Sequence, residues 1–313
     1  MIEKIGAAII CYNDPSSVYK LLSSLSIQHR ALDQVFLIDN SPLSMNLDPE
    51  KYQFKLTYAH FPENLGISGA LEHACKWARD NQLQWLWLFD QDSQPDKDAL
   101  KELTSFIDKN QSSASPIGGV SCEIINQNSN EVISGYQWSG KRFEPINQKG
   151  TDDAYECDAA ITSGFLLNVN SLGDDELPAK QLFIDGVDFE LCLKLRKKNY
   201  KIAVIRAAKL FHNLGSPTKV EIPALGLKKT YDHLSPLRIF CICRNYTHLE
   251  LKYSKLQMRP FVLLYRIKHA LYFSLGSILA GNRKIEGISA AIFGTLQGFL
   301  DPQSWPKKPP FLN

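Results

Sequence analysis

Short apolar runs alternate with helix-patterned segments along the first hundred residues, and this alternation constrains the fold more than any other feature. Short apolar runs occupy residues 5–11, 35–38 and 85–89, and residues 56–61 are also predicted to form a strand. Such runs are typical of strands that are covered on both faces. Helical spacing of apolar side chains, or other helix signals, is found in residues 15–25, 66–80 and 97–108. The order predicts an α/β fold with a mainly parallel sheet flanked by helices.

The rest of the chain is less regular. Strands are predicted at residues 117–125, 159–169 and 200–210, and a short helix at residues 189–198. After Pro217 the pattern changes to amphipathic helices with many basic residues. We therefore expect an α/β domain over residues 1–216, whose two halves divide near residue 115, and a C-terminal helical region over residues 217–313.

Composition excludes several classes of protein. The net charge is only +2, with 35 basic and 33 acidic residues, so nucleic acid is not expected as a partner. The seven cysteines are scattered, mostly within apolar runs, which predicts buried free thiols in a reducing compartment. The N-terminus lacks the pattern of a signal peptide, and the apolar stretch at residues 261–281 is interrupted by charges. A cytoplasmic protein is expected.

Acidic residues follow three of the predicted strands. Asp14 and Asp39 come after the first and second strands, and Asp90 and Asp92 come directly after the fourth. Ligands of open α/β sheets bind beyond the carboxyl ends of the strands. Two crowded carboxylates repel unless a cation relieves the repulsion, and oxygen ligands suit Mg²⁺ or Mn²⁺. The alternative is a turn in which aspartates form turns and helix caps, since Asp96 follows.

A second acidic segment precedes the predicted helix at residues 189–198. If the helix begins near Val187, Asp188 shares its apolar face, whereas Glu190 shares a face with lysines and is expected to be a solvated ion pair. Asp188 is either a helix cap or a general base with a raised pKa. His212, at the end of the strand over residues 200–210, could complete an oxygen-rich metal site or be structural.

The loop between the third strand and the following helix carries glycines. Asn64 and Gly66 lie in this segment, residues 61–69. Glycine lets the backbone approach a ligand or the sheet closely. The spacing matches neither a P-loop nor a dinucleotide fingerprint.

Taken together, these segments resemble glycosyltransferase family 2, and most closely its bacterial rhamnosyltransferase-like branch. The resemblance covers residues 5 to about 216 and depends on the order of its motifs. These are AIICYN from Ala8, LIDNS from Leu37, NLGISG from Asn64, DQDS from Asp90, DFELCLKL from Asp188 and HNLGS from His212.

The resemblance implies a GT-A fold, in which a Rossmann-like nucleotide half, about residues 1–115, merges with an acceptor half, about residues 116–216. It also implies roles for individual residues. Asp188 matches the catalytic base, and Asp92 and His212 match contacts to the metal. Residues matching the donor site are Cys11, Tyr12, Asn13, Asp39, Asn64, Gly66, Asp90 and Gln91. The family's usual Glu-Asp pair reads Val187-Asp188 here, so the acid beside the base is absent.

Four further residues are candidates for contacts with acceptor or phosphate. Arg238 and Arg244 lie in a segment that resembles the start of the C-terminal region in the same branch, and guanidinium groups pair well with phosphate oxygens. Ordinary solvated arginines are the alternative. Trp138 could form a sugar-facing wall, and Gly164 is a candidate on the acceptor side.

The expected activity is inverting, metal-dependent transfer of a sugar from a nucleotide diphosphate donor to a glycan or lipid-linked glycan in cell-surface polysaccharide synthesis. By resemblance dTDP-rhamnose is the first choice of donor, and UDP-galactofuranose or a UDP-hexose is the alternative. A nucleotidyltransferase would need a Gly-rich loop with a basic residue near the first strand, which residues 9–15 lack. A non-catalytic nucleotide-sugar binding protein is the third alternative.

The C-terminal region leaves two interpretations open. Its basic residues, among them Arg259, Arg266 and Lys268, are interspersed with aromatic and aliphatic ones. This mixture suits a helix on an anionic membrane, which would place the protein peripherally at the inner face of the plasma membrane. It also suits an ordinary helix packed on the catalytic domain or in a homodimer, which is the preferred interpretation.

Overall fold

The computed structural model divides the chain into two compact units. It describes residues 4–110, 115–133, 135–147, 150, 152–213, 218–222, 227–231, 234–280 and 283–305. The sheet unit comprises residues 1–137, 144–180 and 188–214; the helical unit comprises residues 138–143, 181–187 and 215–313. Two short internal segments therefore group with the C-terminal residues, a grouping that the sequence pattern did not indicate.

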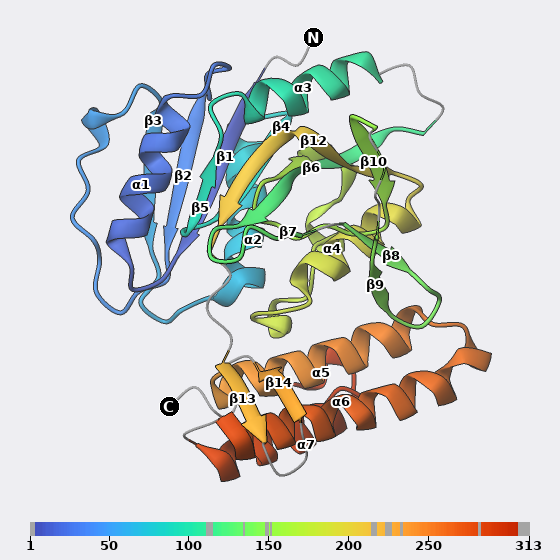
Figure 1. The fold of residues 1–313 in the computed structure, drawn as a ribbon. Coiled ribbons are helices and arrows are strands. Elements are labelled where there is room, and N and C mark those ends of the chain that lie inside the picture. Colours follow the sequence, from blue (N-terminus) through green and yellow to red (C-terminus); the bar gives the residue numbers. More distant parts are fainter. Residues whose placement is uncertain are drawn as a thin grey trace. The chain divides into compact units, whose positions relative to one another are not determined.

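The first half of the sheet unit forms the elements expected from its apolar pattern (Figure 1). They are β1 (Ile5–Cys11), α1 (Pro15–Ser26), β2 (Gln34–Asp39), β3 (Lys55–His60), α2 (Gly66–Asp80), β4 (Trp85–Asp90) and α3 (Ala99–Lys109). Pro15 occupies the first turn of α1, and the Asp14 side chain caps it by accepting from the Ser17 amide. Apolar spacing and helix-start signals were thus sufficient to place these elements.

The second half is built from shorter pieces. Its elements are β5 (Ser93–Pro95), β6 (Ile117–Asn126), β7 (Val132–Ile133), β8 (Tyr136–Trp138), β9 (Phe143–Pro145), β10 (Ala154–Cys157), β11 (Phe165–Asn168), α4 (Val187–Lys197) and β12 (Lys201–His212). The predicted strand over residues 159–169 is wrong in its first half, because only Phe165–Asn168 is a strand. Residues 162–164 form a bend and a turn instead.

The main sheet is mixed and mostly parallel, as predicted. Its strand order is β10-β12-β6-β11-β4-β1-β2-β3. Strands β1 to β4 are mutually parallel, and β11 runs antiparallel between β4 and β6. The carboxyl ends of β1, β2 and β4 therefore meet at one edge, which is the edge where the acidic residues were expected to gather.

Helices cover both faces of the sheet around β1 (Figure 1). On one face Ile5 and Ile9 belong to the apolar core that includes Leu21 and Leu22 of α1. On the other face Gly6 leaves room for Trp77 of α2, since a Cβ at this position would lie 3.2 Å from the Trp77 ring. Burial on both faces explains why β1 is apolar without alternation.

The helical unit is described by itself. It contains β13 (Thr218–Ile222), β14 (Leu227–Tyr231), α5 (Pro236–Tyr253), α6 (Arg259–Ala280) and α7 (Lys284–Gln297). Helix α7 packs closely on α5 through small residues, because a Cβ on Gly294 would lie 2.5 Å from the Phe240 carbonyl oxygen. Short 3₁₀ turns over the two units are Pro49–Lys51, Val169–Ser171, Asp174–Glu176, Lys180–Leu182, Leu256–Met258 and Pro302–Ser304.

Two further expectations concern the whole chain. All seven cysteines are buried and free, as predicted. Among the helices that the structure describes, none combines the length and the apolar character needed to cross a membrane.

Candidate active site

Three of the predicted donor-site residues are neighbours at the carboxyl edge of the sheet. Cys11 pairs with Asp39 in the β1–β2 register, and Ile10 pairs with Asp90 in the β1–β4 register. The ends of β4, β1 and β2 thus present Asp90, Cys11 and Asp39 in a row. Strand pairing alone brings these residues together from three distant parts of the sequence.

Asp39 is a buried residue that accepts hydrogen bonds from the loop after β2 and from β3. Its side chain is fully buried, and its Oδ1 accepts from the Ser41 amide at 2.9 Å while its Oδ2 accepts from the Tyr58 hydroxyl at 2.8 Å and the Met45 amide at 3.3 Å. Burial by itself raises the pKa of Asp39, but these hydrogen bonds outweigh it and leave the pKa lowered. Asp39 therefore carries a charge that holds the loop after β2 in place.

The loop after β1 is bound on both sides. The Gln91 side chain accepts from the Tyr12 amide at 2.6 Å and donates to the Tyr12 carbonyl at 3.1 Å. The Asn13 amide donates to Ser41 Oγ at 2.8 Å, and Asn13 adopts a left-handed φ of 53°. Tyr12 itself is 48% exposed. The Tyr12 backbone is thus fixed at this edge, and its side chain is exposed.

Asn64 and Gly66 shape the loop before α2. Both have left-handed backbone, with φ of 54° and 68°. The Gly66 amide donates to Asn64 Oδ1 at 3.0 Å, and Asn40, next to Asp39, accepts from the Leu65 amide at 3.2 Å. The loops that follow β2 and β3 are therefore tied to each other at the same edge.

Asp92 and His212 meet through a strand that the sequence analysis did not predict. β5 pairs antiparallel with β12, with His212 opposite Ser93. Asp92 Oδ1 consequently lies 3.4 Å from His212 Nδ1. His212 is buried, and its Nδ1 has no hydrogen-bond partner. Burial raises the pKa of Asp92; His212 opposes this effect and Asp90 adds to it.

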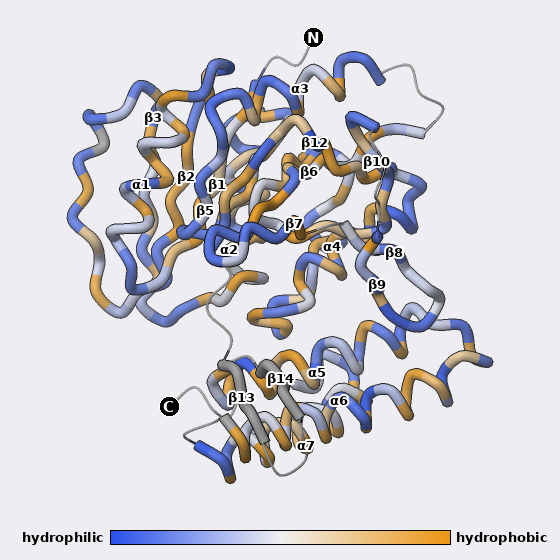
Figure 2. Tube along the Cα trace, in the orientation of Figure 1, coloured by the Kyte–Doolittle hydropathy of each residue, from blue (hydrophilic) through white to orange (hydrophobic). Residues whose placement is uncertain are grey.

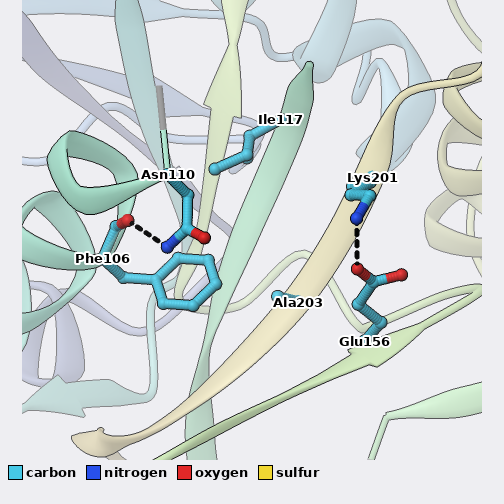
Figure 3. A pocket seen from close by; sticks show the side chains of 6 residues that line it. All are labelled: Phe106, Asn110, Ile117, Glu156, Lys201 and Ala203. Atoms are coloured by element: carbon cyan, nitrogen blue, oxygen red, sulfur yellow. Dashed lines mark hydrogen bonds and ion pairs between the residues drawn. The ribbon is translucent and has the colours of Figure 1, made fainter. Parts of the chain in front are cut away.

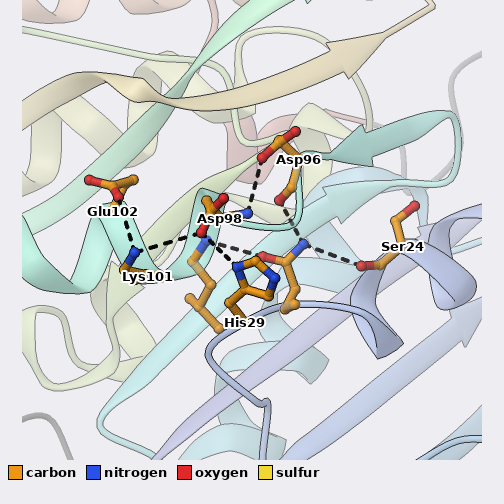
Figure 4. A network of polar contacts seen from close by, with 8 residues as sticks. Ser24, His29, Asp96, Asp98, Lys101 and Glu102 are labelled. Carbon is orange, nitrogen blue, oxygen red and sulfur yellow. Dashed lines mark hydrogen bonds and ion pairs between the residues drawn. The ribbon is translucent and has the colours of Figure 1, made fainter.

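The segment that leaves β5 is anchored away from this pair. Asp96 Oδ1 accepts from the Asp98 amide at 3.0 Å, and Asp98 Oδ1 lies 2.7 Å from His29 Nδ1 just beyond α1 (Figure 4). Gln28 donates to the Asp96 carbonyl at 2.7 Å. Asp96 begins a turn, as the alternative interpretation proposed, and Asp92 lies in a separate turn outside this network.

Two consecutive residues connect the predicted base to the end of β4. Thr162 Oγ1 donates to Asp188 Oδ1 at 2.9 Å, and Ser163 Oγ donates to Asp90 Oδ2 at 2.6 Å. Gly164, with a φ of 78°, completes this turn and donates its amide to the Leu88 carbonyl at 2.8 Å. Sequence reasoning missed Thr162 and Ser163 because it assigned them to a strand. The polar Thr-Ser-Gly run was the signal for a turn.

The start of α4 corrects one prediction. Glu190 was expected to be a solvated ion pair, but it is 1% exposed, accepts from the Ala179 amide at 3.1 Å and lies 3.8 Å from Lys194 Nζ. Its face of α4 is covered by the segment around Ala179, which periodicity within the helix cannot reveal. Asp188 is only half-buried, beside Tyr136, whose pKa is raised by burial and by the Asp188 charge.

Arg238 and Arg244 differ in their exposure to solvent. Arg238 has a 51% exposed side chain, and its Nε donates to Asp185 Oδ2 at 3.1 Å. Arg244 is fully buried and donates to the carbonyl oxygens of Gln181 and Leu182 at 2.6 and 3.2 Å. In this structure Arg244 is thus neither a solvated arginine nor open to a phosphate.

The remaining candidates were Trp138 and the loop after His212. Trp138 packs against Phe143 in the β8–β9 hairpin, with ring centroids 5.0 Å apart. Both residues group with the helical unit, so the sugar-facing role of Trp138 stays a prediction. Leu214, Gly215 and Ser216 of the last motif lie outside the described residues.

A separate hollow lies at the far end of β12. It is lined by Phe106, Asn110, Ile117, Glu156, Lys201 and Ala203, and Lys201 Nζ pairs with Glu156 Oε1 at 2.7 Å (Figure 3). Lys201 begins β12, whereas His212 ends it. This hollow is therefore at the opposite edge of the sheet from the carboxylates and takes no part in the candidate site.

Comparison with known proteins agrees with this geometry. The model of the family described as glycosyl transferase family 2 matches residues 7–163. The chain belongs to glycosyl transferase family 2. The dTDP-rhamnosyl transferase RfbF of Shigella flexneri is 23% identical over 305 residues, covering 95% of this chain and 96% of that protein. The galactofuranosyltransferase GlfT1 of Mycobacterium tuberculosis is 22% identical over 69% of this chain and 72% of its own.

Solved structures support the GT-A fold. Residues 1–349 of S. aureus TarS, in complex with UDP-GlcNAc, superpose with a TM-score of 0.59 at 15% identity, covering 95% of this chain and 81% of that one. GalNAc-T7 with UDP, GalNAc and Mn²⁺ gives a TM-score of 0.55 at 15% identity, covering 89% of this chain and 58% of that one. This family 2 protein is thus a glycosyltransferase with a GT-A fold and a helical C-terminal region.

Proposed function

We propose that this glycosyltransferase inverts configuration, using Asp188 as the base and a divalent cation near Asp92. One observation carries the proposal: the consecutive residues Thr162 and Ser163 bind Asp188 and Asp90, respectively. Asp90 in turn is two residues from Asp92. A proton acceptor and an acidic strand end are thus connected within a single unit, as a direct displacement requires.

Asp92 and His212 suit a divalent cation. The buried Nδ1 of His212 lacks a hydrogen-bond partner and lies 3.4 Å from an Asp92 oxygen, so both atoms could serve as ligands. No cluster of three or more His, Cys, Asp or Glu side chains suited to a metal occurs among the residues described. Mg²⁺ is commonly held by one or two side chains and by substrate phosphates, which fits two protein ligands. When bound, Mg²⁺ or Mn²⁺ would neutralise charge on the leaving nucleotide diphosphate.

The protein's own side chains and loops would transfer the proton and bind the nucleoside. Asp188 accepts the proton of the acceptor hydroxyl as that oxygen attacks the anomeric carbon. Thr162 holds the Asp188 carboxylate in place by donating to its Oδ1. The nucleoside lies against the loops after β1 and β2, where Tyr12 is exposed and Gln91 fixes the backbone. Because a single displacement occurs, the transferred sugar has the inverted configuration at its anomeric carbon.

The proposed donor is dTDP-rhamnose, and the proposed acceptor is a glycan or lipid-linked glycan of a cell-surface polysaccharide. The similarity to RfbF along nearly the whole of both chains supports this choice. The similarity to GlfT1 supports UDP-galactofuranose as the alternative donor. We place the reaction in the cytoplasm, where nucleotide sugars are made.

A donor panel tests the proposal. The protein is incubated with dTDP-rhamnose, UDP-galactofuranose or UDP-GlcNAc, each with Mn²⁺ and with EDTA, and thermal stabilisation and nucleotide release are measured. We expect one donor to raise Tm and to turn over only with the metal, giving a product of inverted configuration by NMR. Equal turnover in EDTA would remove the metal from the mechanism. Failure of every donor to bind or turn over would reject the proposal, and pyrophosphate release from a nucleoside triphosphate would indicate a nucleotidyltransferase.

A further inference from the structure

Helices α6 and α7 expose the side chains that a helix normally buries. In α6 the large apolar residues recur every three or four positions on the solvent side, and in α7 they recur at one- or two-turn spacing and continue just past its end. They are Leu264, Ile267, Leu271, Leu275 and Ile278, then Ile285, Ile292, Leu296, Phe299 and Leu300, each between 44% and 78% exposed. We call this set the apolar face. Figure 2 shows hydrophobic colouring along both helices.

The exposure of the apolar face does not result from loose packing within the helical unit. The opposite sides of both helices are buried. α6 buries Val262, Arg266 and Ser277, and α7 buries Gly287 and Gly294. α5, α6 and α7 pack against one another through these sides. The exposed side is therefore directed away from the unit's own core, and it is larger than the scattered apolar residues of an ordinary surface.

Charge distinguishes between the possible occupants of the apolar face. α6 contains no aspartate or glutamate along its 22 residues, and Arg259 and Lys268 are exposed on it. Arg283 and Lys284 are exposed at the start of α7, where Glu286 pairs with Arg283 at 3.3 Å. Two copies joined through this face would bring cations together, whereas a lipid surface with anionic headgroups would be attracted.

We propose that the apolar face of α6 and α7 lies on an anionic phospholipid surface. The leucines and isoleucines enter the boundary between headgroups and acyl chains, and the cations contact lipid phosphates. Insertion of a single leucine recovers about as much free energy as its burial in a core, so several acting together give stable but reversible attachment. An acceptor carried on a lipid would then be presented at the same surface.

Vesicle flotation tests this proposal with the full chain. The protein is mixed with vesicles of 3:1 POPC:POPG or of POPC alone, at low and high salt. We expect binding to POPG vesicles that weakens with salt, and at least about tenfold weaker binding for the double variant Leu264→Glu, Leu271→Glu. The matched control is Ile27→Glu, since Ile27 is 64% exposed but lies just after α1 in the sheet unit.

Three results would overturn the proposal. The first is flotation that the double variant leaves unchanged, provided that its circular dichroism and melting match the wild type. The second is equal binding to POPC alone, which would remove the anionic requirement. The third is a lipid-free dimer, measured by light scattering, that the double variant converts to monomer while wild-type flotation is absent. That result would assign the apolar face to a second copy of the chain.

Discussion

Helices α1 and α6 are both amphipathic, but they use opposite sides. α1 buries Val18 and Leu22 against the sheet and exposes polar residues, whereas α6 buries Arg266 and Ser277 and exposes leucines. The two units differ in the same sense. The sheet unit has an apolar core and brings its carboxylates to one edge. The helical unit has a smaller apolar core that includes Phe240 and Ala290, and in addition it buries charged side chains and exposes large apolar ones.

This difference indicates what charge does in each unit. Asp188 is half-buried at the edge of the sheet unit, where a proton can reach it. Arg244 is fully buried, with its guanidinium 4.1 Å from the centre of the Trp305 ring, and it satisfies backbone carbonyl oxygens. Removing a charge should therefore lower activity in the sheet unit and stability in the helical unit.

The largest expected effect is on catalysis. Asp188→Asn keeps the size of the side chain but removes the proton acceptor, so kcat should fall about 10²- to 10⁴-fold with nearly unchanged donor affinity and Tm. The control is Asp158→Asn, which removes a carboxylate that pairs with Arg196 of α4 at 3.1 Å. Equal loss of donor binding and transfer in Asp188→Asn would make Asp188 structural and would weaken the contrast between the units.

A smaller effect is expected on stability. Arg244→Ala removes the donor for the Gln181 and Leu182 carbonyl oxygens, and it should lower the free energy of unfolding by about 3 kcal/mol in urea denaturation. Arg238→Ala is the matched control, because its ion pair with Asp185 is half-exposed and should contribute under about 1 kcal/mol. Similar losses in both variants would contradict the structural role assigned to burial.

The smallest expected effect is on how stability depends on pH, and it concerns the buried Glu250 of the helical unit. Burial raises the pKa of Glu250 from 4.5 to about 7, although Arg266 at 2.8 Å lowers it. A carboxyl whose pKa is raised in the folded state stabilises the fold below its unfolded pKa, and this contribution is lost as pH rises through about 7. The wild type should therefore lose stability from pH 5 to pH 8 relative to Glu250→Gln, by about 1 to 3 kcal/mol.

This measurement has an internal check. Burial, together with the charge of Arg266, lowers the pKa of His269 to about 4. His269 titrates in both proteins, so it cancels in their difference. Glu286→Gln is the control, because the Glu286 side chain is 43% exposed and its pKa is lowered rather than raised. A flat difference between wild type and Glu250→Gln would show that the buried pair stays ionised over the whole range.

The element order of the sheet unit and the helical character of the C-terminal region were predictable, whereas contacts between distant segments were not. Buried parallel strands are apolar throughout, so β1 and β4 were visible in the sequence, and their carboxyl ends identified Asp90 and Asp92. β5 was missed because its three residues matter only through their pairing with β12. Glu190 was misjudged because the segment that covers it comes from elsewhere in the chain. Arg244 was misjudged for the same reason: periodicity reports amphipathicity but not which side is covered.

The bridge through Thr162 and Ser163 has a consequence for how this enzyme could change its substrates. One peptide unit sets the spacing between the groups that hold Asp188 and Asp90, so inserting or deleting a residue there would change the distance between the proposed base and the proposed donor-side carboxylate. New sugars or acceptors should therefore arise through changes in the surrounding loops, while this short turn keeps its length.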